Sequence, residues 1–275
     1  MSRRSAPQRE RTRRPVAAKQ RRRTALTRGV SPALERCELT HLARAPIDVE
    51  LARQQHEAYE RCLAAAGCIV KRLAPGDDMP DCVFVEDTAV VLDELALITR
   101  PGAASRRAET AAIAEALSAF RVLQRIEPPA TVDGGDVLMA GRTVFVGRSG
   151  RSNDEGIDQI RSFLAPHGYE TRGIDVSGCL HLKSAVTAIG DGRLLINPAW
   201  VNAREFKGFA LVEIDPAEPF AANALRIGDV LIYSDAFPLT RRRLERRGLR
   251  VVAVDVSETA KAEGGVTCCS LVFAA

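Results

Sequence analysis

Aromatic residues are scarce in this chain, at 5% of its 275 residues, whereas hydrophobic residues make up 46%. We therefore expect a core built mainly of alanine, valine, leucine and isoleucine. No apolar run approaches the roughly 18 residues that a membrane-spanning helix needs, so we expect a soluble protein with no membrane partner. The seven cysteines form no Cys-x-x-Cys pair, and no His-Glu-x-x-His motif occurs. The spacing therefore predicts no metal site.

The N-terminus lacks an apolar segment behind its charges, so we expect no secretory signal. An odd number of cysteines without such a signal indicates reduced thiols and a cytoplasmic location. Gly134-Gly135 is followed neither by a P-loop nor by a dinucleotide-binding fingerprint. The sequence therefore favours chemistry without a cofactor.

The net charge of +4 conceals an uneven distribution. Residues 1–28 hold eleven Lys and Arg and one acid, which leaves residues 29–275 with a net charge of −6. We predict a disordered basic tail over residues 1–28 and a single folded α/β domain over residues 29–275. Contact of the tail with nucleic acid is the alternative. We favour a solubilising extension, because no aromatic residue is interleaved with the arginines.

A strand-strand-helix-strand pattern recurs along the chain. Its first copy consists of the runs 88–92, 95–99, 105–120 and 121–126. Further copies begin near residues 136, 185 and 223, and Asp191-Gly192 is a hairpin signal in one of them. A last strand at 269–273 lacks its helix and strand, which an amphipathic helix at 47–66 and a strand at 68–73 could supply. Repeats of this length predict a five-bladed α/β propeller of ββαβ units closed by the two termini; the alternative is an ordinary α/β sandwich.

Polar residues stand just before the first strand of these units. Glu86, Asp133, His181 and Cys268 follow one another at steps of 47, 48 and 87 residues, the last step spanning a fourth unit with only Asn223. Equivalent positions of a radially repeated fold face the same centre. We therefore expect these side chains to converge on one site.

Cys268 follows two glycines in Glu-Gly-Gly-Val-Thr-Cys-Cys-Ser, residues 263–270. Glycines allow the backbone to approach a ligand closely. A thiolate is the reactive form of cysteine and needs a cation nearby. The alternative for a lone cysteine is a small buried hydrophobe, which we assign to Cys269 because strand alternation turns it away. His181, in Leu-His-Leu-Lys-Ser, could pass a proton to a leaving group, or be a structural histidine.

Three carboxylates, Asp81, Glu86 and Asp87, surround an apolar stretch in Pro-Asp-Cys-Val-Phe-Val-Glu-Asp-Thr. Buried carboxylates require partners, and a guanidinium pairs with them in fork geometry. Internal salt bridges to Arg100 or Arg107 are the alternative. The loops 99–107 and 147–153 carry arginines suited to a substrate carboxylate, although such loops are often simply solvated.

With Asp-Gly-Gly-Asp-Val-Leu and Thr-Arg-Pro-Gly-Ala-Ala-Ser-Arg-Arg, these motifs identify a resemblance. From about Arg28 to Phe273 the chain resembles the dimethylarginine dimethylaminohydrolase (dimethylargininase) family of the guanidino-group-modifying, or pentein, superfamily. The resemblance implies that Cys268 is the nucleophile, His181 the general acid and base, and Asp133 its partner. It also implies a substrate-binding set of Leu39 and Ala262 (through their carbonyls), Asp81, Glu86, Asp87, Arg106 and Arg151.

The implied reaction converts an N-methylated arginine into citrulline and a methylamine through a covalent cysteine thiouronium. An arginine deiminase, another guanidino hydrolase or an amidinotransferase of the same superfamily is the nearest alternative. A non-catalytic propeller that binds a partner is the alternative from a different class. A homodimer is compatible with the sequence.

Overall fold

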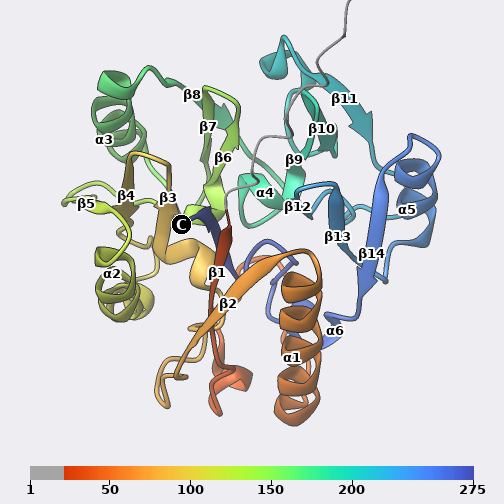
Figure 1. Ribbon diagram of the computed structural model, residues 1–275, viewed down its shortest axis with the longest axis horizontal. Helices are drawn as coiled ribbons and strands as arrows, with labels where there is room; N and C mark the ends of the chain where they lie inside the picture. The colour runs from red at the N-terminus through yellow and green to blue at the C-terminus, as the bar shows by residue number, and fades with distance from the viewer. Residues whose placement is uncertain (1–21) are drawn as a thin grey trace, which may run out of the picture.

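The computed structural model describes residues 22–275. Its strands form five three-stranded sheets arranged around a centre (Figure 1). In each sheet the first two strands are antiparallel and the third is parallel to the middle one. The first strands of all five blades line one cavity. The predicted five-bladed α/β propeller of ββαβ units is confirmed.

The elements follow the repeat closely. Blade 1 contains β3 (Ala89–Val91), β4 (Leu95–Ile98), η3 (Ala104–Glu109), α2 (Thr110–Ser118) and β5 (Val122–Arg125). Blade 2 contains β6 (Val137–Ala140), β7 (Thr143–Arg148), α3 (Asp154–Leu164), η5 (Ala165–His167) and β8 (Glu170–Asp175). Blade 3 contains β9 (Val186–Gly190), β10 (Arg193–Ile196), η6 (Ala203–Phe206) and β11 (Ala210–Glu213). Blade 4 contains β12 (Ala224–Ile227), β13 (Val230–Ser234), α5 (Pro238–Glu245) and β14 (Arg250–Val254).

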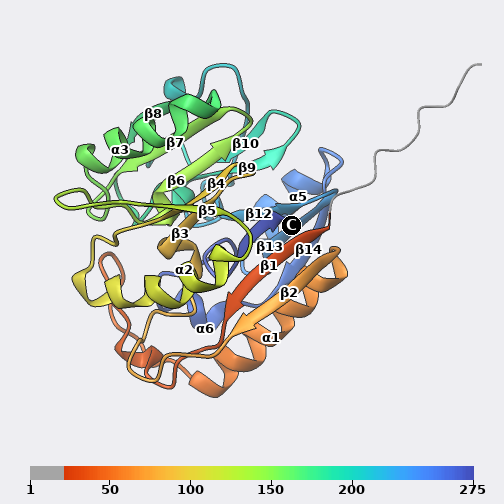
Figure 2. The same cartoon turned by 60° about the vertical axis from the view of Figure 1, so that its left-hand side comes forward.

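The two ends of the chain share blade 5, as Figure 2 shows. It contains β15 (Leu271–Ala274), β1 (Arg23–Arg28), α1 (Val49–Ala65) and β2 (Cys68–Leu73). The expected disordered tail over residues 1–28 is therefore wrong for residues 23–28, which form the middle strand of this sheet. Arg23 and Arg28 at the two ends make this segment look like part of the basic tail, but Thr24-Ala25-Leu26-Thr27 between them are all buried between neighbouring blades. Residues 1–21 of that tail lie outside the described residues.

Apolar layers separate each blade from the next. Along β4, Leu95 and Leu97 pack between blades 1 and 2, whereas Ala96 and Ile98 pack between blades 5 and 1. Side chains of a strand alternate between its two faces, so each middle strand contributes to two layers. The five clusters of buried residues occupy the five interfaces between adjacent blades. The ring is therefore closed by packing as well as by the sheet that joins the termini.

Local signals account for several element ends. Asp48 caps α1, because its side chain accepts a hydrogen bond from Leu51 N at 2.9 Å. Asp191 and Gly192 both have positive φ, at 54° and 68°, as the predicted hairpin requires. After Asn202, blade 3 has only a single 3-10 turn, η6, and the Asn202 side chain accepts a hydrogen bond from Arg204 N.

Short turns position the polar residues just before the first strands. They are the one-turn helices η2 (Val85–Thr88), η4 (Gly134–Asp136) and α4 (Leu182–Ala185). In blade 5 a turn closed by the Cys268 N–H donating to Gly265 O takes the same place. The remaining short helices are η1 (Leu34–Arg36), before α1, and α6 (Ser257–Ala260), after β14. All these turns lie at one mouth of the ring, where the candidate site is found.

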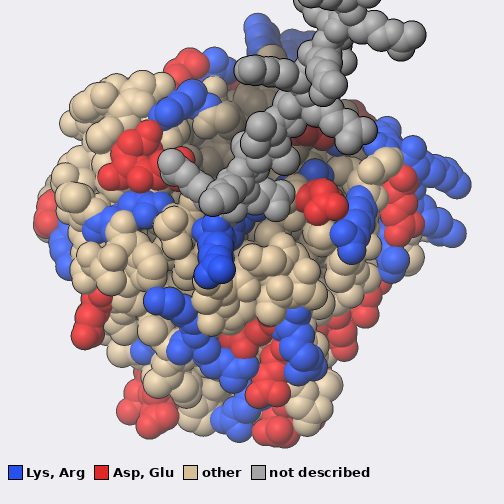
Figure 3. Space-filling view, viewed as in Figure 1, with Lys and Arg blue, Asp and Glu red and all other residues tan. Residues whose placement is uncertain are grey.

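On the face that Figure 3 shows, acidic and basic side chains are mixed over all the blades. Within residues 22–275, no helix is both long and apolar enough to cross a membrane.

Candidate active site

A small cavity of about 20 Å³ lies where the short turns converge. Seven of the ten residues predicted for the site line it: Asp81, Asp87, Arg106, Arg151, His181, Ala262 and Cys268. Asp133 lies directly behind His181, whereas Leu39 and Glu86 do not line the cavity. The repeat analysis thus located residues that are far apart in the sequence.

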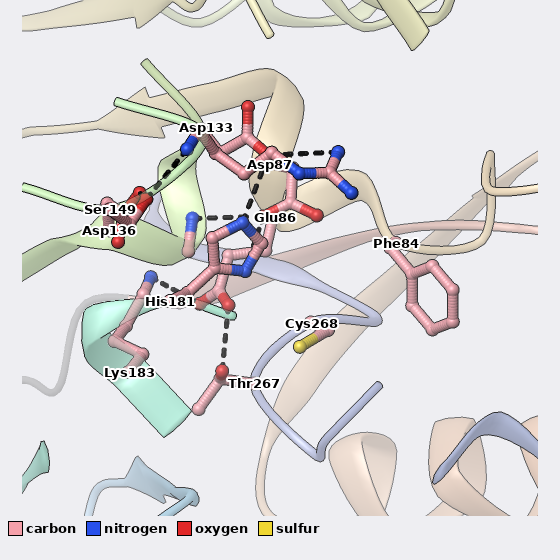
Figure 4. A network of polar contacts seen from close by, with 12 residues as sticks. Phe84, Glu86, Asp87, Asp133, Asp136, Ser149, His181, Lys183, Thr267 and Cys268 are labelled. Carbon is pink, nitrogen blue, oxygen red and sulfur yellow. Dashed lines mark hydrogen bonds and ion pairs between the residues drawn. The ribbon is translucent and has the colours of Figure 1, made fainter. Parts of the chain in front are cut away.

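His181 is held between two carboxylates (Figure 4). Its Nε2 lies 3.0 Å from Asp133 Oδ2, and its Nδ1 lies 3.8 Å from Asp87 Oδ1. Burial alone lowers the pKa of His181, but Asp87, Asp133 and Asp136 outweigh it and raise that pKa to about 9. The imidazole is therefore a cation at neutral pH, ready to donate a proton.

Asp87 has a second cationic partner in Arg106. Asp87 Oδ2 accepts a hydrogen bond of 2.6 Å from Arg106 Nη1, while its Oδ1 accepts one of 3.0 Å from Gly135 N. Burial opposes ionisation of Asp87, but His181 and Arg106 prevail and lower its pKa to about 2. The alternative of an internal salt bridge thus holds for Asp87. Its partner is Arg106, however, whereas Arg100 and Arg107 bond to backbone carbonyls.

Most of the Arg106 guanidinium is already occupied. It donates to Asp87, to Glu109, and to the backbone oxygens of Asp81 and Phe84. These contacts use four of the five N–H groups of an arginine and leave one on Nη1. Arg106 therefore has little capacity left for a ligand.

Arg151 is more weakly engaged than Arg106. Its Nη2 donates to Thr40 Oγ1 at 3.0 Å, and its Nη1 lies 4.0 Å from Asp133 Oδ2.

Ligand atoms of Asp87, Asp133 and His181 lie within 4.8 Å of one another, close enough to hold a metal ion. The sequence predicted no metal site, whereas these three side chains have the spacing of one. Arg106 and Arg151 already lie beside the carboxylates of Asp87 and Asp133 and offset their charge.

Cys268 lies across the cavity from these groups and is half-buried. Its Sγ accepts a hydrogen bond of 3.2 Å from Gly265 N. Burial, and then the charges of Glu86 and Asp87, raise the pKa of the Cys268 thiol to about 12. The thiol is therefore protonated at neutral pH, and a cation close to the sulfur would favour its thiolate.

Glu86 faces away from this cavity. Its Oε1 accepts a hydrogen bond from Lys183 Nζ, and its Oε2 accepts one of 2.7 Å from Thr267 Oγ1. A larger cavity behind it is lined by the first strands of the blades. Glu86 therefore joins the turns of His181 and Cys268 from behind, a role that the sequence did not indicate.

Asp136 is fully buried and joins two other parts of the site. Its Oδ1 accepts a hydrogen bond of 2.9 Å from Leu182 N, next to His181. Its Oδ2 accepts hydrogen bonds of 2.6 and 2.7 Å from the hydroxyls of Ser149 and Ser152, which flank Arg151. The Asp136 carboxylate therefore positions both α4, which follows His181, and the loop that carries Arg151.

Residues 38–42, here called the access loop, border the site, where Glu38 lines the small cavity. The Glu263 carboxylate accepts hydrogen bonds from the backbone N–H groups of Thr40, His41 and Leu42. Ser105 also donates to Glu38, at 2.6 Å. A volume of about 20 Å³ holds roughly one water, so a ligand the size of an amino acid requires the cavity to widen.

The glycine pairs Gly134-Gly135 and Gly264-Gly265 lie close to other parts of the site. A Cβ on Gly135 would lie 2.5 Å from His181 Nδ1, and one on Gly264 would lie 2.3 Å from the Phe84 ring. A Cβ on Gly265 would lie 2.5 Å from Asn223 Oδ1. These glycines therefore allow close approach between parts of the protein itself. Gly264 also lines the small cavity, so the expectation that the glycines before Cys268 let the backbone approach a ligand stays a prediction.

Comparisons with known proteins agree with this architecture. The family described as eukaryotic N,N dimethylarginine dimethylhydrolase matches residues 42–273. An N(G),N(G)-dimethylarginine dimethylaminohydrolase of Streptomyces coelicolor is 42% identical over 249 residues, covering 90% of this chain and 95% of the relative. The enzyme of the same name from Pseudomonas aeruginosa is 39% identical over 228 residues, covering 82% and 90% respectively.

Solved structures extend the likeness to three dimensions. The Pseudomonas aeruginosa enzyme, solved as a cysteine-to-serine mutant with citrulline, superposes with a TM-score of 0.87 and 35% identity, over 91% of this chain and 98% of that one. The N-terminal domain of the cyanobacterial arginine dihydrolase ArgZ shares only the fold, with a TM-score of 0.79 and 19% identity. Since both the family match and the close relatives span most of the sequence, the chain belongs to the dimethylarginine dimethylaminohydrolase family.

Proposed function

We propose that this protein hydrolyses N-methylated arginine to citrulline and methylamine or dimethylamine. The observation that carries the proposal is the charged pair of Asp87 and His181, which lines one small cavity with the Cys268 thiol. A carboxylate, an acid and a nucleophile in one enclosed space are what cleavage of a guanidinium C–N bond needs. Membership of the family supports the same reaction.

Substrate binding follows from the charges around the cavity. The Asp87 carboxylate faces the guanidinium, and Asp81 is placed for the α-amino group. The α-carboxylate takes N–H groups from Arg151 and the one left on Arg106. Leu39 and Ala262 offer backbone carbonyls, and Glu86 acts through Lys183 and Thr267.

Catalysis begins when the bound guanidinium brings a positive charge to Cys268 and favours its thiolate. The sulfur attacks the guanidinium carbon, and a tetrahedral centre forms. His181, a cation at neutral pH, protonates the departing amine as the C–N bond breaks. A thiouronium remains on Cys268, and the neutral His181 then takes a proton from water. Addition of that water and loss of the sulfur release citrulline.

Asp133 and Asp87 give His181 this double role. Both carboxylates stabilise the imidazolium before and after each proton transfer. Asp133 is itself fixed by a hydrogen bond of 2.9 Å from Gly102 N to its Oδ1. The histidine therefore keeps one orientation through both halves of the reaction.

A citrulline assay with four substrates tests the function. We expect release from monomethyl- and dimethylarginine, little from unmodified arginine, and none from agmatine, which lacks the carboxylate that Arg151 would bind. A clear preference for unmodified arginine would instead identify an arginine deiminase. Absence of turnover with all four would favour a non-catalytic binding protein.

The place of action is part of the proposal. All seven cysteines are free thiols and five of them are buried, which suits the reducing conditions of the cytoplasm. Whether the protein forms a homodimer stays a prediction that gel filtration with light scattering would test.

A further inference from the structure

A second cavity, of about 220 Å³, adjoins Cys268 on the side of blade 4. Its inner wall includes the buried side chains of Val256 and Val266, and its outer rim includes Phe220 and Phe237. Phe220 is 45% exposed, so the cavity runs from the surface inwards to the sulfur. Blade 4 is the unit without a catalytic residue, and here it supplies an apolar wall instead.

The two cavities meet at the nucleophile. Cys268, Leu180, Glu263 and Gly264 line both of them. The charged groups Asp81, Asp87, Arg106 and Arg151 line only the small one. The sulfur therefore stands between a polar space and an apolar one.

Several polar side chains of this second cavity already have partners, among them Glu263 and Asn223. Among its described lining residues the one carboxylate is Glu263, which holds the access loop. The Asn223 amide donates to Lys183 O and Thr267 Oγ1 and accepts from Thr267 N. Besides Glu263, the exposed His41 and the two thiols, this lining of described residues has no ionisable side chain, so it suits an alkyl or aromatic group better than the charged ends of an amino acid.

We propose that this cavity receives the substituent of the ω-nitrogen, and that the enzyme hydrolyses Nω-alkyl- and Nω-arylalkylarginines with groups larger than methyl. The inference rests on the proposed function. A substituted nitrogen has fewer N–H groups to offer Asp87, so it turns towards the apolar side. About 10–15 Å³ holds one water, so 220 Å³ far exceeds the needs of two methyl groups.

The chemistry is unchanged by the larger group. The sulfur–carbon bond forms, the bond between carbon and the substituted nitrogen breaks, and His181 supplies the proton with which the amine RNH₂ leaves. Water then replaces the sulfur, so Nω-substituted arginine and water give citrulline and RNH₂. The leaving amine has a direct route to the surface past Phe220.

Substrate length provides the first test. We would measure citrulline release from Nω-methyl-, Nω-propyl- and Nω-benzylarginine. Because each buried CH₂ favours binding by about 0.8 kcal/mol, a factor of about four, kcat/KM for the propyl compound should equal or exceed that for the methyl compound. Turnover of the methyl compound alone would overturn the inference and leave the proposed function standing. No citrulline from any of the three would overturn both.

A matched pair of variants locates the effect. Ser234 is buried, lines the cavity and accepts a hydrogen bond of 3.3 Å from Ala236 N. Ser234→Leu fills the cavity, whereas Ser234→Ala removes the same hydroxyl without adding bulk. We expect Ser234→Leu to lower kcat/KM at least tenfold for propyl and benzyl but less than threefold for methyl, and Ser234→Ala to preserve the ratios.

An equal loss for all three substrates would show that the cavity does not hold the substituent. If Ser234→Leu does not fold, Ala236→Leu at the exposed rim serves the same comparison.

Discussion

Cys268 and Cys269 are neighbours with different surroundings. Cys268 lines both cavities, whereas Cys269 is buried in the apolar layer between blades 4 and 5. We expect Cys268→Ala to lower kcat by at least about a thousandfold, as loss of a nucleophile does. Cys269→Ala, its matched control, should keep most of the activity. Steady-state citrulline release measures both, and comparable rates for wild type and Cys268→Ala would contradict the assignment.

The two catalytic groups predict an unusual pH profile. With pKa values of about 9 for His181 and about 12 for Cys268, the form that reacts carries one proton fewer than the resting form. Below pH 9 the thiolate fraction rises tenfold per pH unit while His181 stays protonated. Above pH 9 the gain in thiolate is cancelled by loss of the His181 proton. We therefore expect kcat/KM to rise with unit slope and level off near pH 9.

Asp133→Asn serves as the control for this profile. Removing a negative charge 3.0 Å from Nε2 lowers the pKa of His181, so the break should move to lower pH. A break that stays in place would mean that another group controls it.

At the scale of elements, the Asp136 side chain joins α4 to the loop that carries Arg151. Asp136→Ala leaves Leu182 N and the hydroxyls of Ser149 and Ser152 without their acceptor. We expect a loss of about 1–3 kcal/mol in the free energy of unfolding and roughly a tenfold fall in kcat, because the turn that carries His181 loses one of its contacts. Ser149→Ala removes only one contact and should have a smaller effect. Chemical unfolding and steady-state kinetics together would show whether the two losses separate.

Glu263 holds the access loop in place through its carboxylate. Its φ of 59° is unfavourable for a side chain with a Cβ, yet the carboxylate accepts three backbone N–H groups. Glycine adopts a positive φ without strain, so Glu263→Gly relieves the backbone but removes the carboxylate that holds the access loop. We expect it to raise KM about tenfold and to speed hydrogen exchange at Thr40, His41 and Leu42. Unchanged exchange at these amides would show that the loop is held by other contacts.

At the scale of the molecule, β1 closes the ring. It pairs with β15 on one side and with β2 on the other. Deleting residues 1–21 keeps all five sheets and every residue of the candidate site, so we expect activity and stability not to change. Deleting residues 1–28 removes the middle strand of blade 5. Its cost should rival the whole free energy of unfolding, about 5–15 kcal/mol. Circular dichroism during heating would separate the two variants, and a cooperative transition in the shorter chain would contradict this.

Much of this molecule could be predicted from local patterns. The hairpin at Asp191-Gly192 and the helix capped by Asp48 depend on residues within one turn. Strand β1 could not be recognised, because Arg23 and Arg28 hide four buried residues whose partners lie in β2 and β15. Similarly, Cys268 and Cys269 lie in a turn before β15, not in the strand that was expected to separate them.

The sequence by itself determined the repeat, the convergence of Cys268, His181 and Asp133, and the membership of the family. These follow from spacing and motifs, which are local in the chain. Only the tertiary structure decided that Arg106 is bonded to Asp87 and Glu109, that Glu86 turns to Lys183 and Thr267, and that Glu263 holds the access loop. Burial forces each charged group to find a partner, and which partner lies within reach depends on how the blades pack.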